Sequence, residues 1–159
     1  MLEAKKEFMQ AAIKQAQIAK AKGDYAIGAV LVKDGQIISS AGNQTFQDES
    51  PIAHAETLVI LEASKKLGTR HLNGCILYST HEPCPMCAAV AVWARVAGIV
   101  YGARNQDMME YSLKNSNKKF LWRIIDISCE EVLNKAQADK IELVKDFMRE
   151  ECIKLFHNA

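Results

Sequence analysis

Four residues in two short stretches have types and spacing that suit metal binding and proton transfer. The first stretch contains His54 and Glu56, and the second places Cys84 and Cys87 three residues apart. Cysteines at this spacing lie on one face of a helix, so both thiolates can bind a single ion. Because imidazole and thiolate groups are ligands that zinc prefers, the sequence predicts that His54, Cys84 and Cys87 bind one Zn²⁺ per chain.

Three protein ligands leave the fourth tetrahedral position of zinc open to water, which is typical of a catalytic site and not of a structural one. Zinc lowers the pKa of that water towards neutrality, but another group must still accept and deliver protons. Glu56 is the candidate for this general acid/base role. It lies two residues from His54, about 200° around an ideal helix, so the spacing alone does not place both side chains on one face.

The two stretches together form the pattern His-x-Glu followed by Pro-Cys-x-x-Cys, which is the signature of zinc deaminases that act on nucleobases. The sequence resembles the cytidine deaminase-like superfamily, in the branch that contains guanine deaminases, tRNA-specific adenosine deaminases and cytosine deaminases. The resemblance extends over most of the chain, and its other segments are Gly28-Ala29-Val30, Asn43, Leu77-Tyr78, Glu82-Pro83 and Tyr101-Gly102-Ala103-Arg104.

The resemblance implies an α/β fold, a three-layer α/β/α sandwich whose mixed sheet has about five strands. It also implies a hydrolase that removes the exocyclic amine of a nucleobase or nucleoside and releases ammonia. In similar enzymes Glu56 would shuttle protons, while the Asn43 side chain and the backbone N–H of Ala55 would contact the base. Enzymes of this kind are usually homodimers, so a homodimer is expected.

The choice of substrate depends on residues outside the signature. Trp93 lies six residues after Cys87, as in guanine deaminases, and its indole is a candidate to stack on a purine. Its apolar neighbours equally favour a position in the core. The Gly-Phe-Asp-Asp stretch of guanine deaminases is absent after Tyr101, which leaves Asp107 or Glu110 as candidate acidic partners for the base. We expect a free purine such as guanine as the substrate.

Three further functions stay open, and the first is a tRNA adenosine-to-inosine deaminase. The segment Tyr101-Gly102-Ala103-Arg104 is closer to those enzymes, but Asn105 follows where they have Asp, and the last helix begins with acidic residues. RNA binding depends on basic contacts to phosphate, and the candidate cluster contains Lys114, Lys118, Lys119 and Arg123. The second function is that of a cytosine deaminase. The third is a non-catalytic zinc-stabilised binding module. A module of this kind would not need Glu56.

Apolar periodicity and turn residues predict the elements that must position these side chains. Helices are expected over residues 2–22, 51–67, 84–95, 128–138 and 147–156. Strands are expected over residues 26–32, 36–40, 75–79, 98–101 and 141–144. Residues 102–119 are polar without a clear period, which predicts a long loop with at most a short helix.

Composition limits the class of protein. The chain has 159 residues, of which 49% are hydrophobic, and a formal net charge of +1. These values indicate one globular domain over residues 1–159 and provide no overall field for binding a polyanion. The start of the chain mixes charges, and no stretch is apolar enough to span a membrane, so we expect a soluble, cytoplasmic protein. Five cysteines without a secretory signal argue against a disulfide framework.

Overall fold

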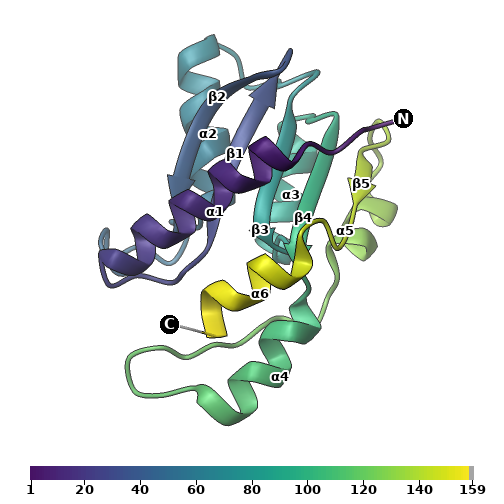
Figure 1. Ribbon diagram of the computed structural model, residues 1–159. Coiled ribbons are helices and arrows are strands. Elements are labelled where there is room, and N and C mark those ends of the chain that lie inside the picture. Colours follow the sequence, from purple (N-terminus) through teal and green to yellow (C-terminus); the bar gives the residue numbers. More distant parts are fainter. Residues whose placement is uncertain (158–159) are drawn as a thin grey trace.

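A five-stranded sheet forms the centre of the computed structural model, which describes residues 1–157 (Figure 1). The strands lie in the order β2-β1-β3-β4-β5. Their bounds are Gly28–Lys33 for β1, Gln36–Gly42 for β2, Ile76–His81 for β3, Gly98–Ala103 for β4 and Glu142–Val144 for β5. Strand β1 is antiparallel to β2 and β3, whereas β3, β4 and β5 are parallel to one another. The predicted mixed sheet is confirmed.

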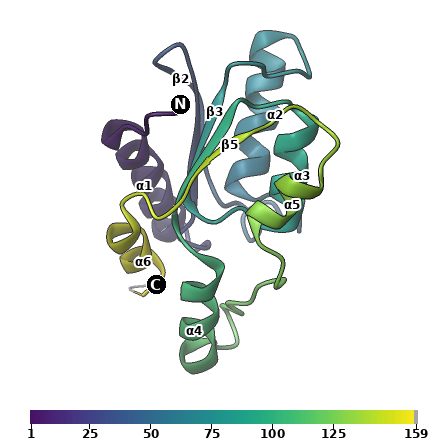
Figure 2. The same cartoon turned by 90° about the vertical axis from the view of Figure 1, so that its right-hand side faces the viewer.

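Six helices are described, and five of them cover the two faces of the sheet. They are α1 (Lys6–Ala21), α2 (Ala55–Leu67), α3 (Pro85–Trp93), α4 (Asn105–Asn115), α5 (Cys129–Lys135) and α6 (Arg149–His157). Figure 2 shows α1 and α6 on one side of the sheet and α2, α3 and α5 on the other, while α4 extends beyond one end. This arrangement confirms the three-layer α/β/α sandwich. Within the described residues, no helix is both long and apolar enough to cross a membrane.

Strand β1 shows why the sheet is apolar on both faces. Ala29 and Leu31 pack into the core beneath α2 and α3, whereas Val30 and Val32 pack into the core beneath α1. Successive side chains of a strand point to opposite faces, and helices cover both faces here. An apolar run without alternation is therefore what a central strand of this sandwich needs.

Helices α1 and α2 each begin four residues later than predicted, at Lys6 and Ala55, and one helix was not predicted as such. Helix α2 begins at Ala55 and not at Pro51, because the backbone N–H of Ala53 donates to Ser50 and the carbonyl of Ala53 accepts from Gln44, which ties this segment to the preceding loop. The predicted loop over 102–119 contains the 11-residue helix α4. Only Met108 of α4 is fully buried, and one buried position gives no readable helical period.

Candidate active site

The three predicted zinc ligands meet where α2 and α3 begin. His54 is the residue before α2, Cys84 is the residue before α3, and Cys87 lies in the first turn of α3. His54 Nδ1 lies 3.6 Å from Cys84 Sγ and 3.5 Å from Cys87 Sγ, and the two sulfur atoms are 3.6 Å apart. Tetrahedral zinc with bonds of about 2.3 Å to sulfur and about 2.0 Å to nitrogen separates such donors by roughly 3.6–3.8 Å. The donor set and its spacing therefore fit Zn²⁺.

The electrostatics of this corner favour a thiolate at Cys84, whereas the hydrogen bond to Cys84 raises the pKa of Cys87. Both helices direct their N-terminal N–H groups towards the site, and the partial positive charge there stabilises anions. The hydrogen bond from Cys87, followed by the contact with His54, lowers the pKa of the Cys84 thiol to about 4. The same contact with Cys84 raises the pKa of His54. The Cys84 thiol is therefore the donor whose ionised form this site favours most.

Glu56 lies beside the donor triangle in a dry environment. Its side chain is 4% exposed, and its Oε2 lies 3.6 Å from Cys87 Sγ. Oε1 accepts a hydrogen bond of 2.9 Å from Ser79 Oγ on β3. Burial raises the pKa of Glu56, which suits a group that must both take and give a proton near neutral pH.

Local backbone geometry explains how His54 and Glu56 reach the same site despite their two-residue separation. His54 is extended, with φ −74° and ψ 149°, and so lies outside the helix that contains Glu56. The angle of about 200° calculated for an ideal helix therefore does not apply to this pair. The catalytic role of Glu56 stays a prediction, but the geometric obstacle to it is absent.

A cavity of about 430 Å³ opens onto His54, Glu56 and Cys84. Its opposite wall comes from residues 121–125, and Met108 of α4 adds to it. A volume of this size is typical of small-molecule sites and accommodates one nucleobase with its sugar. The wall residue Trp122 was missed as a site residue, whereas Arg123 belongs to the basic cluster considered for RNA binding.

Of the four predicted substrate contacts, Asn43 and Ala55 lie close to the zinc ligands in the cavity lining or in sequence. Asn43, which is 3% exposed, lines the cavity. Ala55 is buried and is the first residue of α2, so its N–H is among those without an acceptor inside the helix. Their contacts with substrate stay predictions.

The structure places Trp93 and Asp107 outside this cavity, which corrects the roles expected for them. Trp93 ends α3, is 80% exposed and lines a separate surface groove with Ile60 of α2 and Val132 of α5. Asp107 lies in the first turn of α4, where its carboxylate accepts hydrogen bonds from Arg149 and from the backbone N–H of Arg104. Because these donors already engage both of its oxygens, Asp107 supports the fold of this region.

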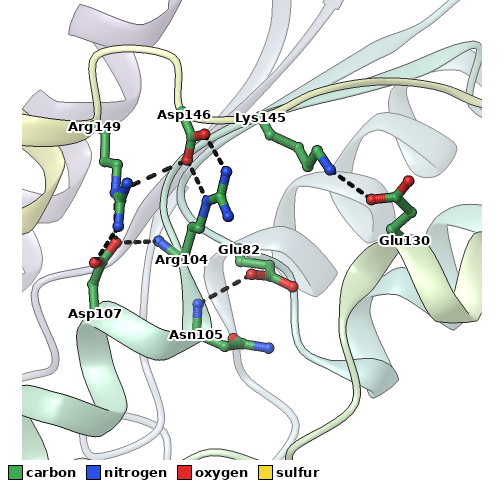
Figure 3. Close-up of polar contacts among 8 residues, drawn as sticks. All are labelled: Glu82, Arg104, Asn105, Asp107, Glu130, Lys145, Asp146 and Arg149. Atoms are coloured by element: carbon green, nitrogen blue, oxygen red, sulfur yellow. Dashed lines mark hydrogen bonds and ion pairs between the residues drawn. The ribbon is translucent and has the colours of Figure 1, made fainter.

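Glu82 connects the segment that carries Cys84 with the starts of α4 and α5. Its carboxylate, only 6% exposed, accepts a hydrogen bond of 3.0 Å from the N–H of Asn105 at the start of α4 (Figure 3). The other oxygen accepts a hydrogen bond of 2.9 Å from the N–H of Cys129 at the start of α5. One buried carboxylate therefore satisfies two helix N-termini, two residues before Cys84.

Two ion pairs connect the start of α4 with the start of α6, as Figure 3 shows. Arg149 donates two hydrogen bonds to Asp107, of 3.0 and 2.6 Å, and Arg104 forms a similar pair with Asp146. Burial acts to raise the pKa of Asp107, but the bonds from Arg149 and Arg104 outweigh it and hold the pKa below its usual value. The C-terminal helix is thus anchored electrostatically to the helix that supports the cavity wall.

We expect Arg149→Ala to lower the free energy of unfolding by about 1–2 kcal/mol, because hydrogen bonds between charged groups stabilise more than neutral ones but Arg149 is partly exposed. Urea denaturation measures the change. Because folding lowers the pKa of Asp107, its ion pair stabilises the protein fully above pH 3.8, the ordinary pKa. This stabilisation is lost as the pH falls through the lower pKa of the folded state. The difference between wild type and variant should shrink accordingly in acid.

The matched control is Lys145→Ala, which breaks an exposed ion pair with Glu130 whose side chains are 40% and 50% exposed. Exposed pairs contribute about 0–1 kcal/mol. Equal losses in Arg149→Ala and Lys145→Ala would contradict the anchoring role of Arg149.

Comparison with known proteins identifies relatives of the whole arrangement. Residues 2–103 match the sequence model of a family described as the cytidine and deoxycytidylate deaminase zinc-binding region. The chain is 53% identical over 96 residues to a tRNA-specific adenosine deaminase of Bacillus subtilis, covering 60% of each chain. It is 42% identical over 104 residues to a guanine deaminase of the same organism, covering 65% of each. The chain thus matches less than two thirds of the length of either relative.

A solved structure from work on A-to-I editing by tRNA:A34 deaminases shares the fold over nearly the whole chain. Its TM-score is 0.78 with 30% sequence identity, and the match covers 95% of this chain and 99% of the other. The family match ends at residue 103. Helix α4, the wall at residues 121–125 and helices α5 and α6 therefore lie outside the segment that defines the family.

Proposed function

Because the chain belongs to the cytidine and deoxycytidylate deaminase zinc-binding family, a family of zinc-dependent deaminases, we propose that it converts adenosine in an RNA loop to inosine. The observation that carries the deaminase activity is the donor triangle with buried Glu56 beside it, opening onto a cavity of about 430 Å³. Adenosine in RNA is proposed because the relatives with this site include tRNA-specific adenosine deaminases.

The reaction exchanges the exocyclic amine for the oxygen of water, so that water and the aminopurine give the oxo-purine and ammonia. Zinc, when bound, supplies the Lewis acidity that lowers the pKa of water. Glu56 accepts the proton of the attacking water, delivers it to a ring nitrogen and then carries a proton to the departing amine. Ser79 holds one carboxylate oxygen through its hydroxyl, and the other oxygen lies on the side of the zinc ligands, 3.6 Å from Cys87 Sγ.

The rim of the cavity supports a single-stranded nucleic acid as the substrate. Tyr25, which lines the cavity, stacks on Phe46 with ring centroids 5.3 Å apart and contacts Phe120 at 5.2 Å. Phe46 is 38% exposed. The amine of Lys119 lies 5.1 Å above the ring of Phe120, and Arg123 lines the cavity. Exposed aromatic rings beside cations suit stacked bases and phosphates of a single strand.

A second candidate is a free purine such as guanine. It is favoured by the acidic start of α6, where Glu150 and Glu151 would repel phosphate. The similarity to a guanine deaminase supports the same substrate. A cavity that accommodates one nucleobase is compatible with both candidates.

One experiment distinguishes the two candidate substrates. Zinc-loaded protein is incubated with an RNA stem-loop that carries adenosine in its loop and, in parallel, with guanine, adenine, adenosine and cytosine. We expect inosine in the RNA and little ammonia from the free compounds. Arg123→Ala should lower kcat/KM for the RNA and reduce the slope of log kcat/KM against log salt by about 1. Lys65→Ala, which removes an exposed cation at the far end of α2, is the control and should change neither. Turnover of guanine without turnover of RNA would favour the second candidate.

A further inference from the structure

A buried carboxylate holds two of the residues that line the cavity, Asn43 and Thr45. Asp24 is 1% exposed and immediately precedes Tyr25 at the entry to β1. Its Oδ2 accepts hydrogen bonds of 3.1 Å from the backbone N–H groups of Phe46 and Gln47. Its Oδ1 accepts a bond of 2.7 Å from the side-chain amide of Asn43. One side chain therefore holds both the loop after β2 and the predicted substrate contact.

This carboxylate decides which way the Asn43 amide points. An ionised carboxylate only accepts hydrogen bonds, so the NH₂ group of Asn43 must face Asp24. The same nitrogen donates a second bond, of 2.8 Å, to Thr45 Oγ1. Both amide protons are then used within the protein, and Oδ1 is the group that Asn43 can offer to a molecule in the cavity that it lines.

The charge on Asp24 is secure at neutral pH. Burial acts to raise its pKa, but hydrogen bonds from Gln47, Asn43 and Tyr25 outweigh burial and lower the pKa below its ordinary value. Asp24 therefore stays ionised at neutral pH and keeps the Asn43 amide in this orientation.

We infer that Asp24 is a positioning residue that holds Asn43 as a hydrogen-bond acceptor, so that Asn43 selects a substrate with a hydrogen-bond donor at that point. The identity of the donor rests on the proposed function. Inside an RNA strand both ester oxygens of the sugar carry phosphate, and the ring nitrogens of adenine are acceptors. The amine and the ring nitrogen that Glu56 protonates both adjoin the carbon under attack, so they face the zinc ligands and Glu56, which leaves the 2′-hydroxyl as the donor for Asn43. Asp24 thus makes the site prefer RNA over DNA, since the 2′-hydroxyl distinguishes the two.

The first test compares an RNA stem-loop with one in which only the target adenosine is 2′-deoxy. Wild type should prefer the all-ribose substrate by about tenfold or more in kcat/KM, because the deoxy substrate leaves a buried acceptor unpaired. Asp24→Asn replaces a group that only accepts hydrogen bonds with one that also donates. The side-chain amide of Asn43 can then flip by 180°, and the ratio of kcat/KM for the two substrates should fall towards one. Gln47→Ala removes a hydrogen bond to Asp24 and one to the backbone carbonyl of Asn43. It keeps the bond between Asp24 and the Asn43 side chain, so it should retain the preference.

The preference is the ratio of kcat/KM for the all-ribose substrate to kcat/KM for the 2′-deoxy substrate. A loss of folded protein lowers both values equally and leaves the ratio unchanged. If Asp24 only supports the loop, Asp24→Asn will slow both substrates equally, and the unchanged preference will overturn the inference.

The second test does not depend on RNA turnover. In zinc-loaded wild type, both side-chain amide protons of Asn43 should exchange slowly with solvent in NMR spectra, and Asp24→Asn should remove this protection. Rapid exchange in wild type would overturn the positioning role. If wild type acts on no RNA, the proposed function fails, and the protection of the Asn43 amide alone then decides the role of Asp24.

Discussion

Glu56→Gln should lower kcat by a factor of about 10²–10⁴, the range associated with loss of a general acid/base group, while the protein keeps its zinc. Glutamine has nearly the same shape as glutamate and can still bond to Ser79, but it cannot accept the proton of the attacking water. Glu56 is not one of the three zinc ligands, so the metal should remain. Ammonia release at saturating substrate and elemental analysis of zinc measure the two results.

Glu62→Gln is the matched control for this substitution. Glu62 lies on the same helix, where it pairs with Lys66 and is 45% exposed. The same chemical change there should leave kcat and zinc content unchanged. Full activity of Glu56→Gln with zinc bound would refute the proposed proton transfer.

Loss of a zinc ligand is the second large effect that we expect. Cys87→Ala should weaken zinc binding by more than the roughly 10–100-fold that follows loss of an outer hydrogen-bond partner, and activity should fall to background. Cys87 is fully buried and contributes one corner of the donor triangle, so no solvent-exposed group can replace it. Zinc content after dialysis and ammonia release measure the effect.

Cys75→Ala provides the control because it also removes a buried thiol, but at the start of β3 and outside the donor triangle. This variant should retain one zinc ion per chain and its activity. Removal of zinc from wild type with a chelator should abolish activity, and added zinc should restore it. An active enzyme that contains no metal would contradict the assignment of the site.

The catalytic corner of the molecule could be predicted from sequence because its determinants are local. Helix N-termini position His54, Cys84 and Cys87, and the spacing of the two cysteines alone places them on one face. The helix predicted from residue 128 also has a local determinant, because Ser128 and Glu131 cap its start with reciprocal hydrogen bonds of 3.0 and 2.7 Å.

The substrate side of the cavity could not be predicted because long-range contacts create it. Glu82 holds the start of α5 across 47 positions of sequence, and the wall at residues 121–125 reaches the site without regular secondary structure. Trp93 was singled out by its spacing from Cys87, yet spacing does not show that α3 turns this position towards solvent. The expectation of a free purine depended on the position of Trp93, whereas the relatives include tRNA-specific adenosine deaminases as well as a guanine deaminase.

The most direct test of the account is deamination in water enriched in heavy oxygen, followed by mass spectrometry of the nucleosides from the RNA stem-loop. Zinc-loaded wild type should produce inosine whose base carbonyl oxygen comes from the solvent, together with an equal amount of ammonia, and Glu56→Gln should produce neither. The contradicting result is that neither the RNA nor any free purine tested loses its amine after prolonged incubation with zinc-loaded wild type.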